Sequence, residues 1–317
     1  MKGRVAVIGA VSTRGQMILK ALADYHLPPK TIMALDYGKY VGNQISYGVG
    51  TISVQDMMTA DFQRIRVVLL CLSGVLRAYV DDIVRAGSIV IDCVGVVGEA
   101  LCVLADKDRP IIPRGRIIVN PTDMTIALAR VLRPIHQSFL VQSVEVTALL
   151  SAGIFGEPAK QALSIQSREP SRRQSQIGGP FRLWQAYNLI PEMDPYLARQ
   201  TIEQMKELFH FPLRVYTCLT PVFRGEAYSL NITTRKAWGP NQLKQVLDRS
   251  KGCCLYPDSL SDLPPTTADC VGSDTVLIGQ PQVVPFQEKT CHLWAICDSE
   301  ACGSAIHAAR LTRYLLS

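Results

Sequence analysis

Short apolar runs alternate with amphipathic segments along the first 125 residues. Residues 5–8, 67–71 and 89–92 are almost continuously apolar and have the length of strands. Residues 16–25 and 76–85 carry apolar side chains at helical spacing. Strands that are apolar on both faces and alternate with helices are typical of a parallel sheet covered on both sides. The pattern therefore predicts an α/β chain that begins with a Rossmann-like domain.

From about residue 142 the pattern changes. Residues 144–150 alternate at first and then lose their polar positions, and several later segments are long enough for extended strands. A polar stretch at 164–179 contains three arginines, which predicts a solvated loop, with an anion-gathering lid as the alternative. The second half is thus predicted to be an α+β domain with a long mixed or antiparallel sheet. Its expected helices cover residues 196–209, 241–248 and 303–316, and its expected strands cover residues 213–218, 226–234 and 291–297.

Composition narrows the class of protein. The chain has 317 residues, of which 48% are hydrophobic and 19% charged, so one large or two modest globular domains are expected. The net charge of +6 is spread along the chain and does not indicate a nucleic-acid face. No apolar run approaches the roughly 20 residues of a membrane span. Ten cysteines without a CxxC pair, and five scattered histidines, predict buried reduced thiols, no metal site and a cytoplasmic protein.

A glycine turn links the first predicted strand to the first helix. It reads Gly9-Ala-Val-Ser12-Thr13-Arg14-Gly15, with Ser12 at the place where a middle glycine would allow a pyrophosphate to approach closely. Backbone amides of such a turn, together with the helix N-terminus, bind phosphate groups. The alternative is that the two glycines serve only the packing of strand against helix.

Asp36 ends the second predicted strand, 21 residues after Gly15. An acidic residue at this place accepts a ribose 2′-hydroxyl in dinucleotide sites. Because a carboxylate would repel a 2′-phosphate, the sequence favours NAD over NADP, although Lys39 could reach a phosphate. Asp36 could also be only a turn residue.

With these segments in view, the chain resembles the aspartate-semialdehyde dehydrogenases, and it is most similar to their Usg-type relatives. The resemblance runs in order through the glycine turn, Asn120-Pro-Thr-Asp-Met-Thr, residues 146–152, residues 186–191, Pro221-Val-Phe-Arg-Gly-Glu226 and residues 302–309. It implies a homodimer whose dinucleotide-binding domain, residues 1–125, is completed by the helix at 302–317. Residues 126–301 would form the catalytic and dimerisation domain.

The resemblance also implies that the family's chemistry is missing. Active members carry a nucleophilic cysteine where this chain has Asp123, and an acid-base histidine where it has Glu226. A carboxylate cannot replace a thiolate that attacks an aldehyde and later releases an acyl group. Four further family positions differ: the substrate-orienting glutamine is Leu150, the arginine that binds the substrate carboxylate is Leu219, the phosphate-binding arginine is Gly98, and the cofactor-side asparagine is Ser299.

Three interpretations follow from these differences. In the first, the chain is a dimeric pseudoenzyme that can still bind a dinucleotide, and its two carboxylates are solvated or paired with Arg224 or Arg235. In the second, Asp123 and Glu226 face one another and perform acid-base work or hold a divalent cation. In the third, an NAD(P)-dependent oxidoreductase acts on a substrate that needs no covalent step. Acyl chemistry by another cysteine would require Cys71 or Cys93, which follow neighbouring strands.

Overall fold

The computed structural model describes residues 4–75, 77–95, 100–104, 112–168, 183–192, 195–257, 263–283 and 287–317. The chain folds into two compact units, which are considered separately. The first contains residues 1–121 and 304–317, and the second contains residues 122–303.

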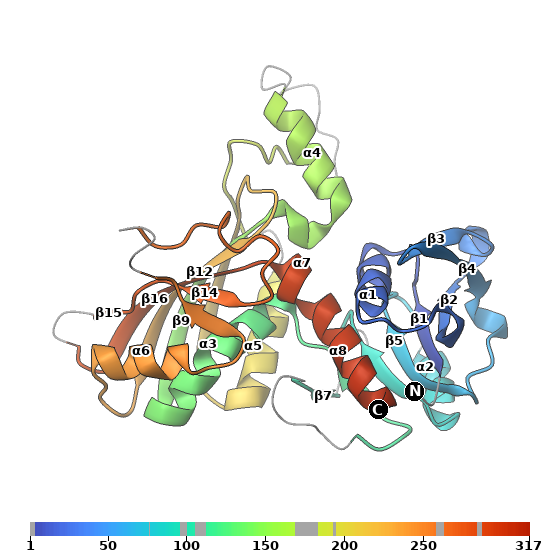
Figure 1. Ribbon diagram of the computed structural model, residues 1–317, viewed down its shortest axis with the longest axis horizontal. Helices are drawn as coiled ribbons and strands as arrows, with labels where there is room; N and C mark the ends of the chain where they lie inside the picture. The colour runs from blue at the N-terminus through green and yellow to red at the C-terminus, as the bar shows by residue number, and fades with distance from the viewer. Residues whose placement is uncertain are drawn as a thin grey trace. The chain divides into compact units, whose positions relative to one another are not determined.

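The first unit is built on an eight-stranded sheet in the order β3-β4-β2-β1-β5-β6-β8-β7 (Figure 1). All pairings are parallel except that between β3 and β4. The central strands are buried on both faces, which explains their uninterrupted apolar sequence. The strands are β1 (Arg4–Ile8), β2 (Ile32–Asp36), β3 (Gln44–Tyr47), β4 (Gly50–Asp56), β5 (Ile65–Leu70), β6 (Ile89–Asp92), β7 (Leu101–Cys102) and β8 (Ile117–Val119).

Helices cover both faces of this sheet. The helices α1 (Thr13–Asp24) and α8 (Ser304–Leu316) pack on the face that carries Val5 and Val7, and α2 (Arg77–Arg85) packs on the face that carries Ala6 and Ile8. This alternation follows from the two-residue period of a strand. Short 3-10 turns η1 (Pro29–Thr31), η2 (Gly38–Tyr40) and η3 (Met57–Thr59) complete the unit.

The second unit has a mixed sheet in the order β10-β11-β9-β12-β16-β14-β13, with β15 also paired to β16. The strand β9 alternates buried Val144, Val146 and Ala148 with exposed Glu145 and Thr147, so along this part of the strand one face of the sheet is buried and the other is exposed. The strands are β9 (Val141–Leu150), β10 (Ile190–Pro191), β11 (Leu213–Leu219), β12 (Glu226–Thr234), β13 (Cys253–Leu255), β14 (Val276–Ile278), β15 (Gln282–Val283) and β16 (Thr290–Cys297).

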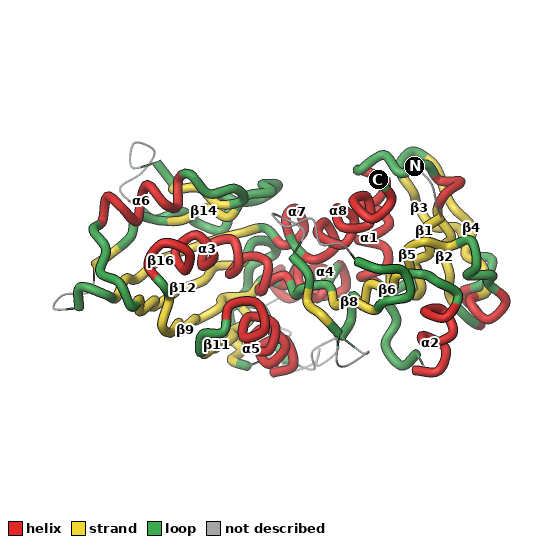
Figure 2. The backbone as a smooth tube through the Cα atoms, turned by 90° about the horizontal axis from the view of Figure 1, so that it is seen from below, coloured by secondary structure: helices red, strands yellow, loops and turns green. Residues whose placement is uncertain are grey.

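Three helices pack against the sheet of the second unit. The helices α3 (Asp123–Phe139), α5 (Pro195–Phe209) and α6 (Pro240–Asp248) pack against β9, β11 and β13 respectively (Figure 2). The remaining helical segments of the described part are η4 (Ala152–Phe155), α4 (Glu157–Arg168) and α7 (Ser299–Cys302). None of the described helices is long and apolar enough to cross a membrane.

The predicted fold class is confirmed, but two expectations about the elements were wrong in detail. The boundary expected between residues 125 and 126 lies inside α3, because Thr122 caps this helix and begins it earlier. Residues 164–168 belong to α4, which buries Leu163 and Gln166; the rest of the predicted polar loop, including Arg172 and Arg173, lies outside the described residues. The terminal helix predicted at 303–316 agrees with α8, which begins one residue later, after Gly303.

Candidate functional site

The glycine turn between β1 and α1 leaves no room for side chains at its two ends. Gly9 has φ +80°, and a Cβ atom there would lie 2.9 Å from the backbone carbonyl of Cys71. A Cβ atom on Gly15 would collide with the carbonyl oxygen of Gly9. Both glycines are therefore required by close backbone packing, whatever the turn binds.

The turn satisfies most of its own hydrogen bonds. The amides of Gly9 and Ala10 donate to the carbonyl of Leu35, and the amide of Ser12 donates to the carbonyl of Gly9. The Ser12 hydroxyl caps α1 by accepting from the amide of Gly15 at 3.0 Å. It also lies 2.7 Å from the carbonyl oxygen of Gly9.

Thr13 and Arg14 occupy the first turn of α1. The first amides of a helix have no acceptor within the helix, and none of the described hydrogen bonds uses the amides of these two residues. These two amides lie at the N-terminal end of α1, where the positive end of the helix dipole attracts anions. The Arg14 guanidinium is turned toward α8, where it donates to the hydroxyl of Ser304.

The carboxylate of Asp36 is hydrogen-bonded within the same turn. Asp36 is only 3% exposed. One carboxylate oxygen accepts from the amide of Val11 at 3.1 Å, and the other accepts from the amide of Tyr37 at 3.0 Å. The carboxylate thus fixes the turn, and contact with a ribose remains a prediction.

The topology places this turn where open α/β sheets bind ligands. The strand β1 has β2 on one side and β5 on the other, and the chain passes from β1 through α1 to β2. The direction of winding changes between β1 and β5, and ligands bind beyond the carboxyl ends of the strands at such a switch point. Gly9 and Cys71 follow these two strand ends.

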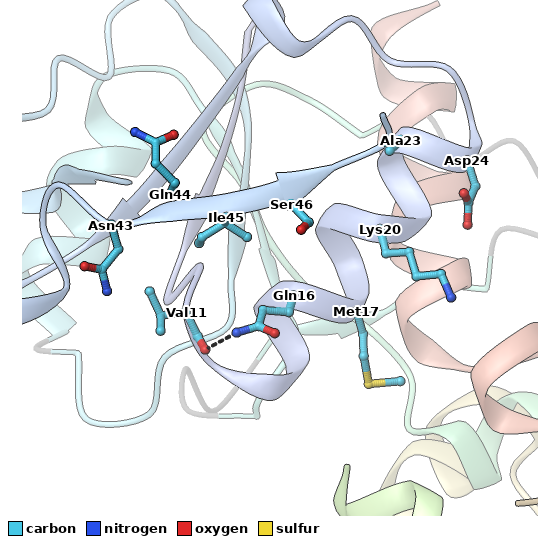
Figure 3. Close-up of a pocket in the computed structure, with 11 residues that line it drawn as sticks. Val11, Gln16, Met17, Lys20, Ala23, Asp24, Asn43, Gln44, Ile45 and Ser46 are labelled. Atoms are coloured by element: carbon cyan, nitrogen blue, oxygen red, sulfur yellow. Dashed lines mark hydrogen bonds between the residues drawn. The ribbon is translucent and has the colours of Figure 1, made fainter. Parts of the chain in front are cut away.

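A cavity of about 690 Å³ begins beside the turn and extends between α1 and β3 (Figure 3). Val11 and Gln16 line it near the turn, and the Gln16 side chain donates to the carbonyl of Val11 at 2.9 Å. The other lining residues are Met17, Lys20, Ala23, Asp24, Asn43, Gln44, Ile45, Ser46 and Gly48.

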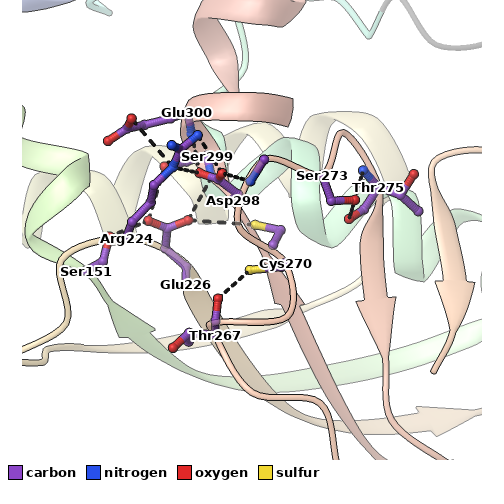
Figure 4. Close-up of polar contacts among 12 residues, drawn as sticks. Ser151, Arg224, Glu226, Thr267, Cys270, Ser273, Thr275, Asp298, Ser299 and Glu300 are labelled. Atoms are coloured by element: carbon purple, nitrogen blue, oxygen red, sulfur yellow. Dashed lines mark hydrogen bonds and ion pairs between the residues drawn. The ribbon is translucent and has the colours of Figure 1, made fainter. Parts of the chain in front are cut away.

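In the second unit, Glu226 is the centre of a buried polar cluster (Figure 4). It begins β12, is 1% exposed, and accepts hydrogen bonds from three donors. The hydroxyl of Ser151 lies 2.8 Å away, the amide of Ser299 lies 3.0 Å away, and the hydroxyl of Ser299 lies 3.1 Å away. This set of donors accounts for a carboxylate that is closed off from solvent.

Burial raises the pKa of Glu226 to about 7. The hydrogen bonds from Ser151 and Ser299 act in the opposite direction, and the negative charge of Asp123 raises this pKa further. Near neutral pH the group therefore exists in both protonation states, which is the range in which a general acid or base works.

Asp123 is the first residue of α3 and is partly buried. A Cβ atom on Gly303 would collide with its Oδ1, so the carboxylate rests against the end of α7. Its negative charge raises the pKa of Glu226, and the expectation that the two carboxylates face one another stays a prediction.

Arg224 does not neutralise Glu226, and that expectation was wrong. Its guanidinium forms a paired contact with Asp298, with distances of 3.0 Å from Nε to Oδ1 and 2.7 Å from Nη2 to Oδ2. Asp298 is fully buried, caps α7 through the amide of Glu300, and accepts from the amide of Gly272. The arginine therefore neutralises Asp298, and Glu226 is held by two hydroxyls and an amide instead.

A second cation lies at the edge of this network. Lys160 of α4 contacts Glu300 and Glu157, each at 3.0 Å. Glu300 also approaches Arg224, with 3.6 Å between Oε2 and Nε. The two cations are therefore engaged by acidic partners other than Glu226.

The two leucines expected at family binding positions lie side by side. Leu150 ends β9, Leu219 ends β11, and the two are register partners of adjacent parallel strands. Both are buried, at 1% and 0% exposed. Neither side chain carries a polar group that could bind a substrate carboxylate, and their place in the family's binding site stays a prediction. Gly98 lies outside the described residues.

The thiols are poorly suited to attack. Cys71 and Cys93 are buried in the first unit, and hydrogen bonding to Cys71 together with burial raises the pKa of Cys93 well above its ordinary value. In the second unit, Cys297 Sγ lies 3.9 Å from Glu226 Oε2. Hydrogen bonding to Cys302 and burial also raise the pKa of Cys297 well above its ordinary value. A protonated thiol is a weak nucleophile.

Sequence reasoning missed Ser151 and Asp298. Ser151 directly follows a strand end, and Asp298 opens a helix N-cap pattern of Asp-Ser-Glu. The cap pattern could have been found, but the contact of Ser151 with Glu226 joins residues 75 apart. Within the described ranges, no group of three or more His, Cys, Asp or Glu side chains is placed to hold a metal ion.

Comparison with known proteins bears on both units. Residues 4–98 match the family model "Semialdehyde dehydrogenase, NAD binding domain". The chain is 26% identical to an aspartate-semialdehyde dehydrogenase of Bacillus subtilis, across 98% of this chain and 96% of that protein. It is 25% identical to a USG-1 protein homolog of Azotobacter vinelandii, across 98% and 97%. The chain is a homologue of the aspartate-semialdehyde dehydrogenases.

Solved structures agree on the fold of this homologue. Aspartate semialdehyde dehydrogenase II of Vibrio cholerae, complexed with ASA, superposes with a TM-score of 0.88 at 23% identity, over 100% of this chain and 98% of that one. The enzyme of Candida albicans with NADP gives a TM-score of 0.74 at 15% identity, over 99% and 98%. The family resemblance and the α/β fold class predicted from the sequence are confirmed.

Proposed function

We propose that this homologue has lost aspartate-semialdehyde dehydrogenase activity and retains a dinucleotide site in its first unit. The observation that carries the proposal is the state of Glu226. At the position assigned to the acid-base histidine, the chain has a buried carboxylate held by Ser151 and Ser299. At the position assigned to the nucleophile it has Asp123.

The acyl reaction needs a thiolate in contact with the aldehyde carbon. Asp123 cannot supply one. Cys297 is close to Glu226, but its raised pKa keeps the sulfur protonated. The buried leucines at 150 and 219 remove the groups that would hold an acidic substrate.

The dinucleotide proposal is supported by the first unit alone. The glycine turn lies at the topological switch point, the amides of Thr13 and Arg14 stand at the start of α1, and a cavity begins at Val11. These residues fit a pyrophosphate, with Gly9, Ser12 and Gly15 shaping the turn. A bound nicotinamide dinucleotide would supply hydride chemistry. Asp36 would favour NAD, because its buried carboxylate next to Val11 opposes a 2′-phosphate.

We place the contact of a homodimer on the face of the second sheet that carries the exposed side chains of β9. Thr147, Tyr216, Ser229 and Trp294 form one row across β11, β9, β12 and β16 on that face. Tyr216 is 58% exposed. The structure describes all ten cysteines and none is in a disulfide, which supports a reducing, cytoplasmic location.

The alternative is an active NAD(P)-dependent oxidoreductase that acts on an aldehyde or oxo group. The observation in its favour is the pKa of Glu226 near 7, because a buried acid of this kind exchanges a proton at neutral pH. In this case Glu226 would donate or accept the proton, and the negative charge of Asp123 would raise the pKa of Glu226.

Calorimetry with NAD and with NADP, at low salt, tests the dinucleotide site. We expect micromolar binding of NAD, weaker binding of NADP, and loss of both in Gly9→Val. Parallel assays with aspartate semialdehyde should show no turnover, with the Bacillus subtilis relative as positive control. Failure to bind either dinucleotide would overturn the proposed site. Turnover would overturn the loss of activity.

Asp123→Ala and Glu226→Ala separate the two candidates. If the protein is an oxidoreductase, a screen of aldehydes and ketones should yield hydride transfer that Glu226→Ala reduces at least about 100-fold. If no compound reacts and both variants bind NAD like the parent, the pseudoenzyme proposal stands.

A further inference from the structure

The cavity between α1 and β3 starts at Val11, the residue whose amide donates to Asp36 (Figure 3). From β1, the sheet continues on this side through β2 and β4 to β3. In dinucleotide sites, the acidic residue that ends the second strand marks the side on which the adenosine ribose lies. A dinucleotide with its pyrophosphate at the glycine turn would therefore direct its adenosine half toward this cavity, and its nicotinamide half toward β5.

Backbone hydrogen bonds fix Asn43 at the near end of the cavity. Its carbonyl accepts from the amide of Val54 at 2.9 Å, and its amide donates to the carbonyl of Tyr40 at 3.2 Å. Val54 of β4 is the register partner of Ala34, which lies two residues before Asp36 in β2. The sheet, rather than a free loop, therefore sets the position of Asn43 relative to the turn.

The side-chain amide of Asn43 is available to a ligand. It lines the cavity, and Figure 3 shows it on the side of β3 that faces Val11. None of the described residues forms a hydrogen bond with this side chain. Gln16, an amide of α1 at the same end, already donates to the carbonyl of Val11 at 2.9 Å. Asn43 thus offers a donor and an acceptor that lie in one plane.

The cavity wall at this end is apolar. Val11, Met17 and Ile45 line the cavity and pack against the core of the first unit. The charged lining residues Lys20 and Asp24 lie in the later turns of α1. An apolar wall with a free amide at its edge suits a flat, uncharged heteroaromatic base better than it suits a phosphate.

We propose that this end of the cavity binds the adenine of the dinucleotide and that Asn43 makes it selective for an amino-substituted purine. The inference rests on the dinucleotide site proposed above. An asparagine amide pairs with adenine through two hydrogen bonds: its oxygen accepts from the exocyclic amino group, and its nitrogen donates to the neighbouring ring nitrogen. Hypoxanthine has a carbonyl oxygen in place of the amino group, so the amide oxygen of Asn43 would face a second acceptor.

The experiment compares NAD with nicotinamide hypoxanthine dinucleotide, which differs from NAD only in the base, by calorimetry on the full-length protein. A two-bond contact of this kind discriminates between bases by about fivefold or more, so NAD should bind at least about fivefold more tightly. Asn43→Leu should lower the affinity for NAD by a similar factor and bring the two affinities within about twofold of each other.

Gln63→Leu is the matched control. It removes an exposed amide of the first unit that does not line the cavity, so both affinities should stay as in the parent. Thermal unfolding checks that Asn43→Leu folds, and Asn43→Ser is the second variant, because it removes the same pair of hydrogen bonds with a small polar side chain.

Equal affinity of the parent for the two dinucleotides would overturn the inference, and so would a preference for NAD that persists in Asn43→Leu. If the parent binds neither dinucleotide, the dinucleotide proposal fails, and titration with adenosine monophosphate and inosine monophosphate then tests the base site by itself. Tighter binding of adenosine monophosphate that disappears in Asn43→Leu would support the base site. Equal binding of the two nucleotides, or no binding, would overturn it.

Discussion

The glycine turn of the first unit and the Glu226 cluster of the second have diverged in different ways. The turn depends on backbone contacts, so Gly9 and Gly15 tolerate no side chain. The cluster depends on side chains, and there a carboxylate is accommodated by two serines and an amide. Backbone packing constrains a binding turn even without a ligand. A catalytic side chain can be replaced wherever its neighbours satisfy the substitute.

The largest loss of stability should come from a substitution within the glycine turn. Gly9→Val places a branched side chain at φ +80° and 2.9 Å from Cys71, so the free energy of unfolding should fall by about 3–5 kcal/mol. Gly38→Ala is the control, because Gly38 has φ +58° and open space around it. It should cost only about 1 kcal/mol. Equal losses in chemical denaturation would contradict the close-packing argument.

Arg224→Met should have the next largest effect. It leaves the buried carboxylate of Asp298 without its cation, which should lower the free energy of unfolding by about 3 kcal/mol. Arg85→Met removes an exposed pair with Asp82 and should change stability by less than about 0.5 kcal/mol. Similar urea midpoints for the two variants would show that Asp298 is not dependent on Arg224.

Glu226→Gln tests the protonation of the cluster. The folded pKa of about 7 exceeds the ordinary 4.5, so between these values the folded protein holds a proton that the unfolded chain has released. The free energy of unfolding should therefore fall as pH rises through this window, by about 3 kcal/mol in total.

Glu226→Gln should remove this fall and be more stable than the parent above pH 7. Exposed Glu288→Gln is the control and should leave the pH profile unchanged. Parallel stability curves for the parent and Glu226→Gln, measured from pH 4 to 9, would disprove the raised pKa.

The smallest effect is expected from Ser151→Ala. Loss of its 2.8 Å hydrogen bond should lower the free energy of unfolding by about 1–2 kcal/mol. The loss should be larger at pH 8 than at pH 5, because the hydroxyl stabilises the charged carboxylate more than the neutral acid. Ser53→Ala, on the exposed side of β4, should have little effect at either pH. If the loss of stability did not depend on pH, the Ser151 hydroxyl would not stabilise the charged carboxylate of Glu226 more than the neutral acid.

Much of the fold was predictable because its signals are local. The bounds predicted for β6 and β12 agree with the structure, since continuous or alternating apolar runs determine a strand without distant information. The helix α4 was missed, because its sequence is rich in polar residues and only Ala159, Leu163 and Gln166 are buried. Its stability comes from tertiary packing, which a polar sequence does not reveal.

The candidate site was predictable in its residues and not in its contacts. The order of segments was sufficient to single out Asp123, Glu226 and the glycine turn. It could not show that Arg224 pairs with Asp298 or that Asp36 holds the amide of Val11. Each of these partners is distant in the chain, so only the folded chain shows which groups meet.

The sequence by itself determined the alternation of strands and helices and the glycines of the turn, and it predicts the replacement of the family's reactive side chains. The tertiary structure alone decided the burial and hydrogen bonding of Glu226 and the partners of Arg224. Periodicity and residue type act over a few neighbours along the chain. Desolvation and hydrogen bonding depend on which distant segments enclose a group, and only the folded chain brings those segments together.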